Sequence, residues 1–219
     1  MSIRAVIFDM DGVLTDSEPL ICEAAIRMFR ERGCTAQPED FRPFVGAGEN
    51  RYIGGVAEKH GIRLDIAEAK KRTYEIYLDL VPSRLRAFPG AVELVRACRA
   101  AGLRIAVASS ADRIKVDANL RQIGLPAAEW DAVLTAEDVE RRKPAPDIFL
   151  AAAGRMRAEP AECVVIEDAP NGIRAARAAG MRCVAVAQTF AAGDLSEADA
   201  VRPGIADVTV AGLLSPLSA

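Results

Sequence analysis

From residue 90 onward, short apolar runs of strand length alternate with amphipathic segments of helical period. These runs are rich in Val, Ile and Ala and are apolar on both faces, which is typical of parallel strands covered by helices on both sides. The expected strands are LRIAVASS, DAVLTA, CVVIEDA, MRCVAVA and, last, ADVTVAG; the accompanying helices are AVELVRACRAAG, ADRIKVDANLRQIG, PDIFLAAAGRM and PNGIRAARAAG. The sequence therefore predicts a doubly wound α/β domain with a parallel sheet, in which ligands bind at the carboxyl ends of the strands.

An all-helical segment interrupts this alternation directly after the first apolar run, Ile3 to Phe8. It contains three amphipathic stretches with no strand between them: EPLICEAAIRMFRERG, NRYIGGVAEKHG and IAEAKKRTYEIYLDLV. We expect a small helical cap inserted after the first strand. The predicted boundaries are 1–16 and 83–219 for the core and 17–82 for the cap. The two connections, near Thr15–Ser17 and Arg84–Pro89, would form a hinge and make the cap a lid.

The composition is that of a globular protein and excludes several partners. Of the 219 residues, 51% are hydrophobic, and the net charge of −3 offers no surface for nucleic acid or an anionic membrane. No apolar run reaches the roughly 18 residues of a membrane span. The cysteines are widely spaced without a CxxC pair, and the opening residues do not resemble a secretory signal. We therefore expect reduced thiols, no zinc site and a cytoplasmic location. The oligomeric state is not fixed by the sequence, which is compatible with a monomer.

Polar residues gather where the predicted strands end. They are Asp9 and Asp11 after the first run, Ser109 and Ser110 after RIAVA, Glu167 and Asp168 after CVVI, and Lys143 in RRKPAPDIF before a helix. Because parallel strands end at the same edge of a sheet, we expect these side chains to converge on one crevice.

Each of these features also has a purely structural explanation. The DxD pair fits an Asx-turn, the serine pair fits a helix cap, the acidic pair suits a helix N-terminus, and Lys143 fits an exposed surface. None of these explanations accounts for the four features lying at one end of one sheet. Carboxylates brought together repel one another unless a cation neutralises them, and a set of hard oxygen ligands suits Mg²⁺, which also meets phosphate. A hydroxyl group and a lysine then suit the remaining phosphate oxygens.

Four ordered motifs resemble those of the haloacid dehalogenase superfamily: DMDGVLTDS, VASS, KPAPDIF and VIEDAPNGI. They are most similar to the members with a helical cap after the first motif, the group that contains β-phosphoglucomutase and small sugar-phosphate phosphatases. Several stretches also resemble the phosphatase-like domain of a larger plant thylakoid protein. The resemblance implies a Mg²⁺-dependent phosphatase that hydrolyses a small phosphorylated metabolite through an aspartyl-phosphate.

The resemblance also implies a role for each catalytic candidate. Asp9 would be the nucleophile, and Asp11 would be the general acid and base. The dehalogenating branch lacks this second acid, so its presence favours phosphoryl transfer. Ser109 would hydrogen-bond the transferring phosphoryl group, and Lys143 would offset the charge on that group and on Asp9.

A metal site and a set of substrate contacts are implied in the same way. Asp168 would hold Mg²⁺ together with the carboxylate of Asp9 and the backbone carbonyl of Asp11, with Glu167 close by, directly or through water. The candidate substrate contacts are Gly12, Ser110, Gly46, Arg51 and Asn171. Gly12 would also permit a sharp turn after the strand.

The cap loop FVGAGENRYIGG departs from the mutase pattern. The mutase has a lysine before the loop glycine, an arginine after it and a histidine soon after the first motif, whereas this chain has Val45, Glu49 and Ile21 at the corresponding positions. The cations expected to hold a second phosphate are therefore missing, although Arg51 remains a candidate contact. The single histidine, His60, is interpreted as a helix-end residue with no nearby partner.

Two alternatives to the phosphatase remain at this stage. One is a β-phosphoglucomutase-like sugar-phosphate mutase. The other is a non-catalytic domain that binds a phosphoryl group without turnover. A decayed site usually loses its nucleophile or its acid, and both Asp9 and Asp11 are present, so the sequence favours turnover.

Overall fold

A computed structural model describes residues 2–46 and 48–215, and within these residues it contains one six-stranded parallel sheet with the order β3-β2-β1-β4-β5-β6. The strands are β1 (Ala5–Phe8), β2 (Arg104–Ala108), β3 (Ala132–Leu134), β4 (Cys163–Glu167), β5 (Arg182–Val186) and β6 (Ala200–Arg202). β1 lies in the centre and pairs in parallel with β2 on one side and β4 on the other. The predicted α/β fold is confirmed, and the three strands that carry the candidate residues are neighbours.

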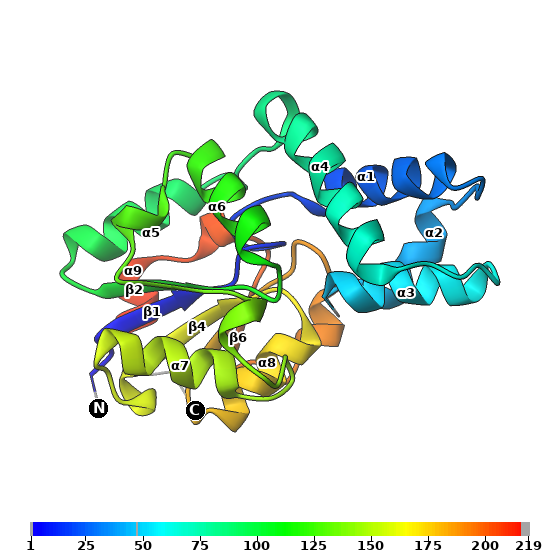
Figure 1. The fold of residues 1–219 in the computed structure, drawn as a ribbon. Helices are drawn as coiled ribbons and strands as arrows, with labels where there is room; N and C mark the ends of the chain where they lie inside the picture. The colour runs from blue at the N-terminus through cyan, green and yellow to red at the C-terminus, as the bar shows by residue number, and fades with distance from the viewer. Residues whose placement is uncertain (1, 47, 216–219) are drawn as a thin grey trace.

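Helices cover both faces of the sheet (Figure 1). They are α5 (Ala91–Ala100), α6 (Arg113–Gln122), α7 (Asp147–Met156), α8 (Pro170–Ala178) and α9 (Val210–Leu214). Val6 and Phe8 of β1 point to one face and pack in a core with α5, α6 and α9. Ala5 and Ile7 point to the other face and pack with α7 and α8. Both faces of the central strands β1 and β4 are therefore buried, which explains why these two strands are largely apolar.

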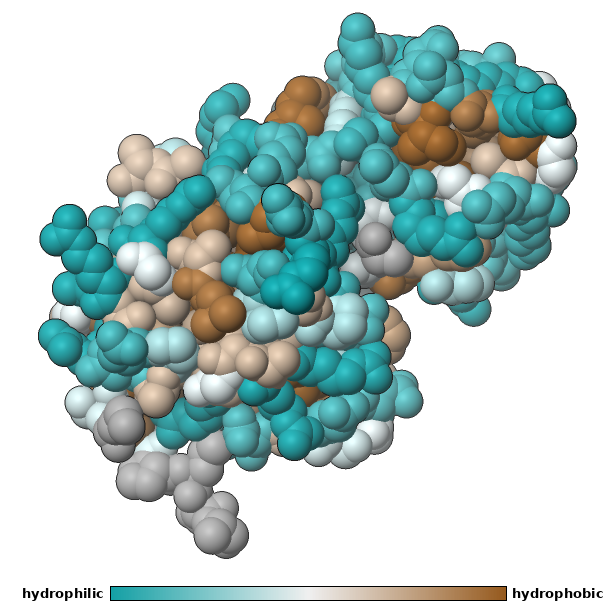
Figure 2. Space-filling view, turned by 60° about the horizontal axis from the view of Figure 1, so that its bottom comes forward, coloured by the Kyte–Doolittle hydropathy of each residue, from teal (hydrophilic) through white to brown (hydrophobic). Residues whose placement is uncertain are grey.

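Four helices between β1 and β2 form the cap: α1 (Glu18–Glu31), α2 (Pro38–Phe41), α3 (Glu49–Lys59) and α4 (Ile66–Arg84). The cap has its own apolar core, in which the rings of Phe29 and Phe41 meet edge to face at 5.9 Å. Figures 1 and 2 show the cap as a smaller lobe beside the body that contains the sheet. The predicted helical cap is confirmed. Its boundaries at residues 17 and 82 stay a prediction, and α4 runs past residue 82 to Arg84.

The two connections between cap and core lie side by side. Thr15 forms an antiparallel bridge with Ala87, and the amide of Phe88 donates to the carbonyl of Leu14 at 3.0 Å. A buried hydrogen bond from Tyr77 of α4 to Asn119 of α6, 2.7 Å long, also joins cap to core. These contacts hold the cap over the carboxyl ends of the strands.

The prediction of a last strand at ADVTVAG, residues 206–212, is wrong. The sheet is completed instead by β6, which pairs with β5, and residues 206–212 enter short helices. The hydroxyl of Thr209 accepts from the amide of Gly212 at 3.1 Å and caps α9, while Val208 and Leu213 are buried against the core. Local capping by Thr209 therefore outweighs the strand-like alternation of this segment.

His60 ends α3, but the expectation that it has no partner is wrong. Its Nε2 lies 2.7 Å from a carboxylate oxygen of Asp40 in α2.

Across the described ranges, no helix combines the length and the apolar character that crossing a membrane requires. In the view of Figure 2 the surface is mostly hydrophilic, with apolar residues in small patches.

Candidate active site

The first candidate pair stands where β1 ends. Asp9 follows the strand directly and is 7% exposed, and its amide donates to the carbonyl of Ile166 in β4 at 2.9 Å. Two residues later, Asp11 is half-buried. Gly12 has a φ of 84°, and a Cβ at this position would lie 1.9 Å from a carboxylate oxygen of Asp168. Only glycine therefore lets the chain turn this close to Asp168.

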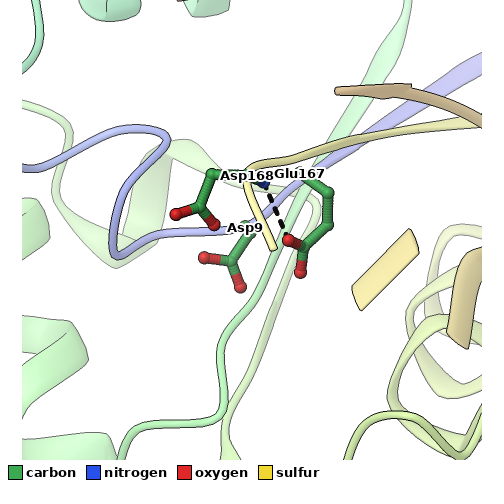
Figure 3. Close-up of side chains that lie close together, drawn as sticks. All are labelled: Asp9, Glu167 and Asp168. Carbon is green, nitrogen blue, oxygen red and sulfur yellow. Dashed lines mark hydrogen bonds between the residues drawn. The ribbon is translucent and has the colours of Figure 1, made fainter. Parts of the chain in front are cut away.

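Three carboxylates meet at the ends of β1 and β4. Asp9, Glu167 and Asp168 are buried, and each offers an oxygen within 4.8 Å of the others (Figure 3). One oxygen of Glu167 accepts from the amides of Asp168 and Ala169, each at 2.8 Å, which fixes this side chain at the start of α8.

Lys143 provides the neighbouring positive charge. Its Nζ donates to Asp9 at 2.5 Å, to Glu167 at 2.7 Å and to the carbonyl of Ala108 at 3.2 Å, and its side chain is 6% exposed. Burial alone would lower the pKa of Lys143, but Asp9 and Glu167 raise it above its ordinary value. Lys143 is therefore held in its charged form.

The acidic group, by which we mean the carboxylates of Asp9, Glu167 and Asp168, is not fully neutralised by Lys143. Burial raises the pKa of Asp9 to about 7, in spite of Lys143, and the charge of Glu167 adds to this effect. Burial, together with the charges of Glu167 and Asp9, also raises the pKa of Asp168. Three buried carboxylates face one ammonium group, and all the available ligands are oxygen atoms. This donor set fits a hard divalent cation such as Mg²⁺.

The serines and Asn171 lie at the same edge of the sheet. Ser109 follows β2, is buried, and accepts from the amide of Ala111 through its hydroxyl at 3.1 Å. Ser110 comes next, and Asn171 lies in the first turn of α8, where its side chain accepts from Arg174 at 2.7 Å.

A cavity of about 300 Å³ lies between the core and the cap. The predicted residues that line it are Asp9, Asp11, Gly12, Gly46, Ser109, Ser110, Lys143, Glu167, Asp168 and Asn171. Arg51 does not line it. Its half-exposed side chain pairs with Glu58 at 2.8 Å and lies over the ring of Phe44 at 5.0 Å. The structure therefore brings the predicted set together with the exception of Arg51.

The sequence reasoning missed Lys115, which links the core to the cap. This residue of α6 has a side chain that is 4% exposed, and its Nζ lies 3.0 Å from Asp11 and 3.6 Å from Glu49 of the cap. The hydroxyl of Ser17 also donates to Asp11. The sequence does hold a sign of this role, because Lys115 lies on the same side of α6 as the apolar residues Val116 and Leu120, which are buried. A charged residue on such a stripe needs a buried partner.

The cap side of the cavity also carries acids that were not predicted as site residues. Glu18 accepts from the hydroxyl of Tyr52 at 2.7 Å, and burial raises its pKa to about 7 in spite of that bond. Burial likewise raises the pKa of Glu49, against the opposing charge of Lys115. The pKa of Lys115 itself, which burial would lower, is raised by Asp11 and Glu49. Glu18 and Glu49 therefore add acidic groups to this end of the cavity, which Lys115 and Arg42 also line.

Comparison with known proteins identifies the family. Residues 3–180 match the family described as "Hydrolase: haloacid dehalogenase-like hydrolase". The chain belongs to this family. Its resemblance to the helical-cap group is confirmed, and so is the prediction that it is an enzyme of the haloacid dehalogenase-like hydrolase class.

Individual relatives share most of the chain. It is 48% identical over 97% of its length to the Arabidopsis thaliana protein "SUPPRESSOR OF QUENCHING 1, chloroplastic", of which it spans 21%. It is 32% identical to Hexitol phosphatase A of Escherichia coli, with 96% of this chain and 95% of the relative covered. A crystal structure of mutant CbbY from Rhodobacter sphaeroides in complex with xylulose-1,5-bisphosphate superimposes with a TM-score of 0.88 at 28% identity, covering 96% of this chain and 99% of that one. Because the plant relative is named as chloroplastic, the cytoplasmic location of this chain stays a prediction.

Proposed function

We propose that this protein is a Mg²⁺-dependent phosphatase that hydrolyses the phosphate monoester of a small metabolite through an aspartyl-phosphate on Asp9. The observation that carries the proposal is the buried carboxylate of Asp9, bonded to Lys143 beside Glu167 and Asp168 on the floor of the cavity. The names of several relatives, including Hexitol phosphatase A of Escherichia coli and "Phosphorylated carbohydrates phosphatase" of Thermotoga maritima, support the same reaction class.

Asp9 is placed to attack phosphorus. One of its oxygens is held by Lys143, which orients the carboxylate, and the attack forms an acyl phosphate as the bond to the leaving oxygen breaks. Lys143 offsets charge on the phosphoryl group during this step, and Ser109, which lines the same cavity, offers it a hydroxyl. Asp9, Asp168 and the carbonyl of Asp11, with Glu167 close by, would hold Mg²⁺, whose positive charge would reduce the repulsion between the carboxylate and a dianionic phosphate.

Asp11 is placed to move the protons. As a general acid it protonates the leaving oxygen, and as a general base it then removes a proton from the water that hydrolyses the acyl phosphate. Its carboxylate accepts a hydrogen bond from Ser17 and pairs with Lys115, at the boundary between the core and the cap. A domain that only binds a phosphoryl group has no use for this second acid, so the arrangement favours turnover.

The cap favours hydrolysis over mutase activity. At the positions where a mutase places cations for a second phosphate, this chain presents Ile21, Val45 and Glu49 to the cavity, whereas Arg42 and Arg174 line it from other positions. Glu49 repels a second phosphate by roughly 1 kcal/mol at ~4 Å in a water-like medium, and by more where water is excluded. We therefore infer that monophosphates of small polyols or sugars are the substrates.

The test is a screen of phosphorylated metabolites and p-nitrophenyl phosphate for phosphate release. We expect release that EDTA abolishes and Mg²⁺ restores, with Zn²⁺ a poor substitute because the proposed ligands are all oxygen atoms. Full activity in metal-free buffer would overturn the proposed metal site. A second assay adds β-glucose 1-phosphate with a trace of the 1,6-bisphosphate. Glucose 6-phosphate that forms faster than free phosphate would replace the phosphatase with a mutase.

A further inference from the structure

Glu49 has a carboxylate oxygen that lacks a partner. The residue is the first of α3, is 7% exposed and lines the cavity. Its Oε1 lies 3.6 Å from the ammonium group of Lys115. Its Oε2 is buried and has no hydrogen-bond partner within residues 2–46 and 48–215. Buried carboxylate oxygens are normally paired, because an unpaired one loses its hydration without compensation.

Among the described residues, the groups around Glu49 are mainly hydrogen-bond acceptors, and the donors that face it are the ammonium group of Lys115 and the hydroxyl of Tyr74. Asp11, Glu18 and Glu49 line this end of the cavity together with Lys115, and Arg42 of the cap lines the cavity as well. The hydroxyl of Tyr52 already donates to Glu18. A ligand that reaches this end therefore meets acceptors, and it gains most if it brings a donor of its own.

The position of Glu49 is set by contacts on both sides of the cavity. Gly48 precedes it with a φ of 80°, and a Cβ on Gly48 would lie 2.0 Å from the guanidinium group of Arg142 in the core. Lys115, also from the core, faces one oxygen and leaves the other free. Both contacts cross from core to cap, so the position of Glu49 depends on how the cap packs on the core.

We propose that Glu49 determines specificity by accepting, through Oε2, a hydrogen bond from a hydroxyl or protonated amine on the leaving group of the substrate. This inference rests on the proposed phosphatase function and names the substrate class of the same site. The preferred substrates are phosphate monoesters whose leaving group carries hydrogen-bond donors. Simple alkyl phosphates, and compounds with a second phosphate at this end, are disfavoured.

The test uses three phosphate monoesters with four-carbon leaving groups: butyl phosphate without a donor, erythritol 4-phosphate with hydroxyls and 4-aminobutyl phosphate with an amine. Because Glu49 shares Lys115 with Asp11, its loss can change kcat/KM for every substrate, so the readout is a ratio. We expect Glu49→Ala to lower kcat/KM for the two donor-bearing compounds by about 10-fold or more relative to kcat/KM for butyl phosphate. Glu49→Gln separates the two donors, because an amide oxygen still accepts from a hydroxyl but does not attract an ammonium charge. The matched control is Glu58→Ala, which removes an exposed acid of the same helix.

A binding measurement separates this inference from the proposed function. Calorimetry on the Asp9→Asn chain, with and without Glu49→Ala, measures the affinity for the same three compounds without turnover. A loss of affinity confined to the donor-bearing compounds supports the role of Glu49, even if the parent releases no phosphate and the phosphatase proposal fails. Equal losses for all three compounds, or no loss for any, would overturn the role of Glu49.

Discussion

Replacing Lys143 by methionine tests whether the acidic group depends on a buried counter-charge. The side chain of Lys143 is 6% exposed and bonds to both Asp9 and Glu167. Removing one partner of a buried ion pair costs about 3–5 kcal/mol, because the remaining charges lose both solvent and counter-ion. For a protein of this size, each kcal/mol lowers Tm by about 2–4 °C, so we expect Lys143→Met to lower Tm by about 6–20 °C in EDTA.

Thermal or urea unfolding in EDTA and in Mg²⁺ measures this effect. Mg²⁺ should stabilise the Lys143→Met variant more than the parent, because the added cation neutralises the carboxylates that have lost their lysine. The control is Lys59→Met, which breaks an ion pair with Asp40 on a lysine that is half exposed, for a cost of about 0–1 kcal/mol. If the Lys143→Met variant is as stable in EDTA as the parent, or loses no more than the control, the account of the buried charges is wrong.

Two further perturbations test other parts of the account. Asp9→Asn should lower kcat by roughly 10³-fold or more while the protein stays folded, since an amide is a poor nucleophile; activity within tenfold of the parent would show that Asp9 is not the nucleophile. In the cap, hydrogen bonds from Lys59, the amide of Gln37 and His60 hold the pKa of Asp40 well below its ordinary value of 3.8. The stabilisation from Asp40 is therefore fully present above about pH 4 and is lost as the pH falls towards the folded-state pKa. Asp40→Asn should cost about 1–3 kcal/mol in urea unfolding at neutral pH and progressively less as the pH is lowered below about 4, and a cost that does not depend on pH would contradict this.

The strand-end residues could be predicted because their placement follows from topology. Parallel strands end at one edge, so Asp9, Ser109 and Asp168 had to share that edge once a doubly wound sheet was inferred. These residues directly follow β1, β2 and β4, which are neighbours in the sheet. The order of the strands could not be predicted, because it does not follow from local sequence patterns.

The cap side of the cavity was harder to predict. Glu49 and Arg51 are both charged residues of one loop sequence, but they stand two positions apart on α3, about 200° around the helix, so both cannot face the cavity. The approach of Lys115 to Glu49 depends on how the cap packs on the core, which is a tertiary contact between distant segments.

The covalent intermediate tests the central claim most directly. In Asp11→Asn, the amide cannot deprotonate water, so the phosphorylated enzyme should accumulate when substrate and Mg²⁺ are added. After acid quenching and proteolysis, mass spectrometry should find one added phosphoryl group on the peptide that contains Asp9. An added phosphoryl group on Ser109 or Ser110, or no covalent adduct under conditions in which the parent hydrolyses the same substrate, would contradict the aspartyl-phosphate mechanism.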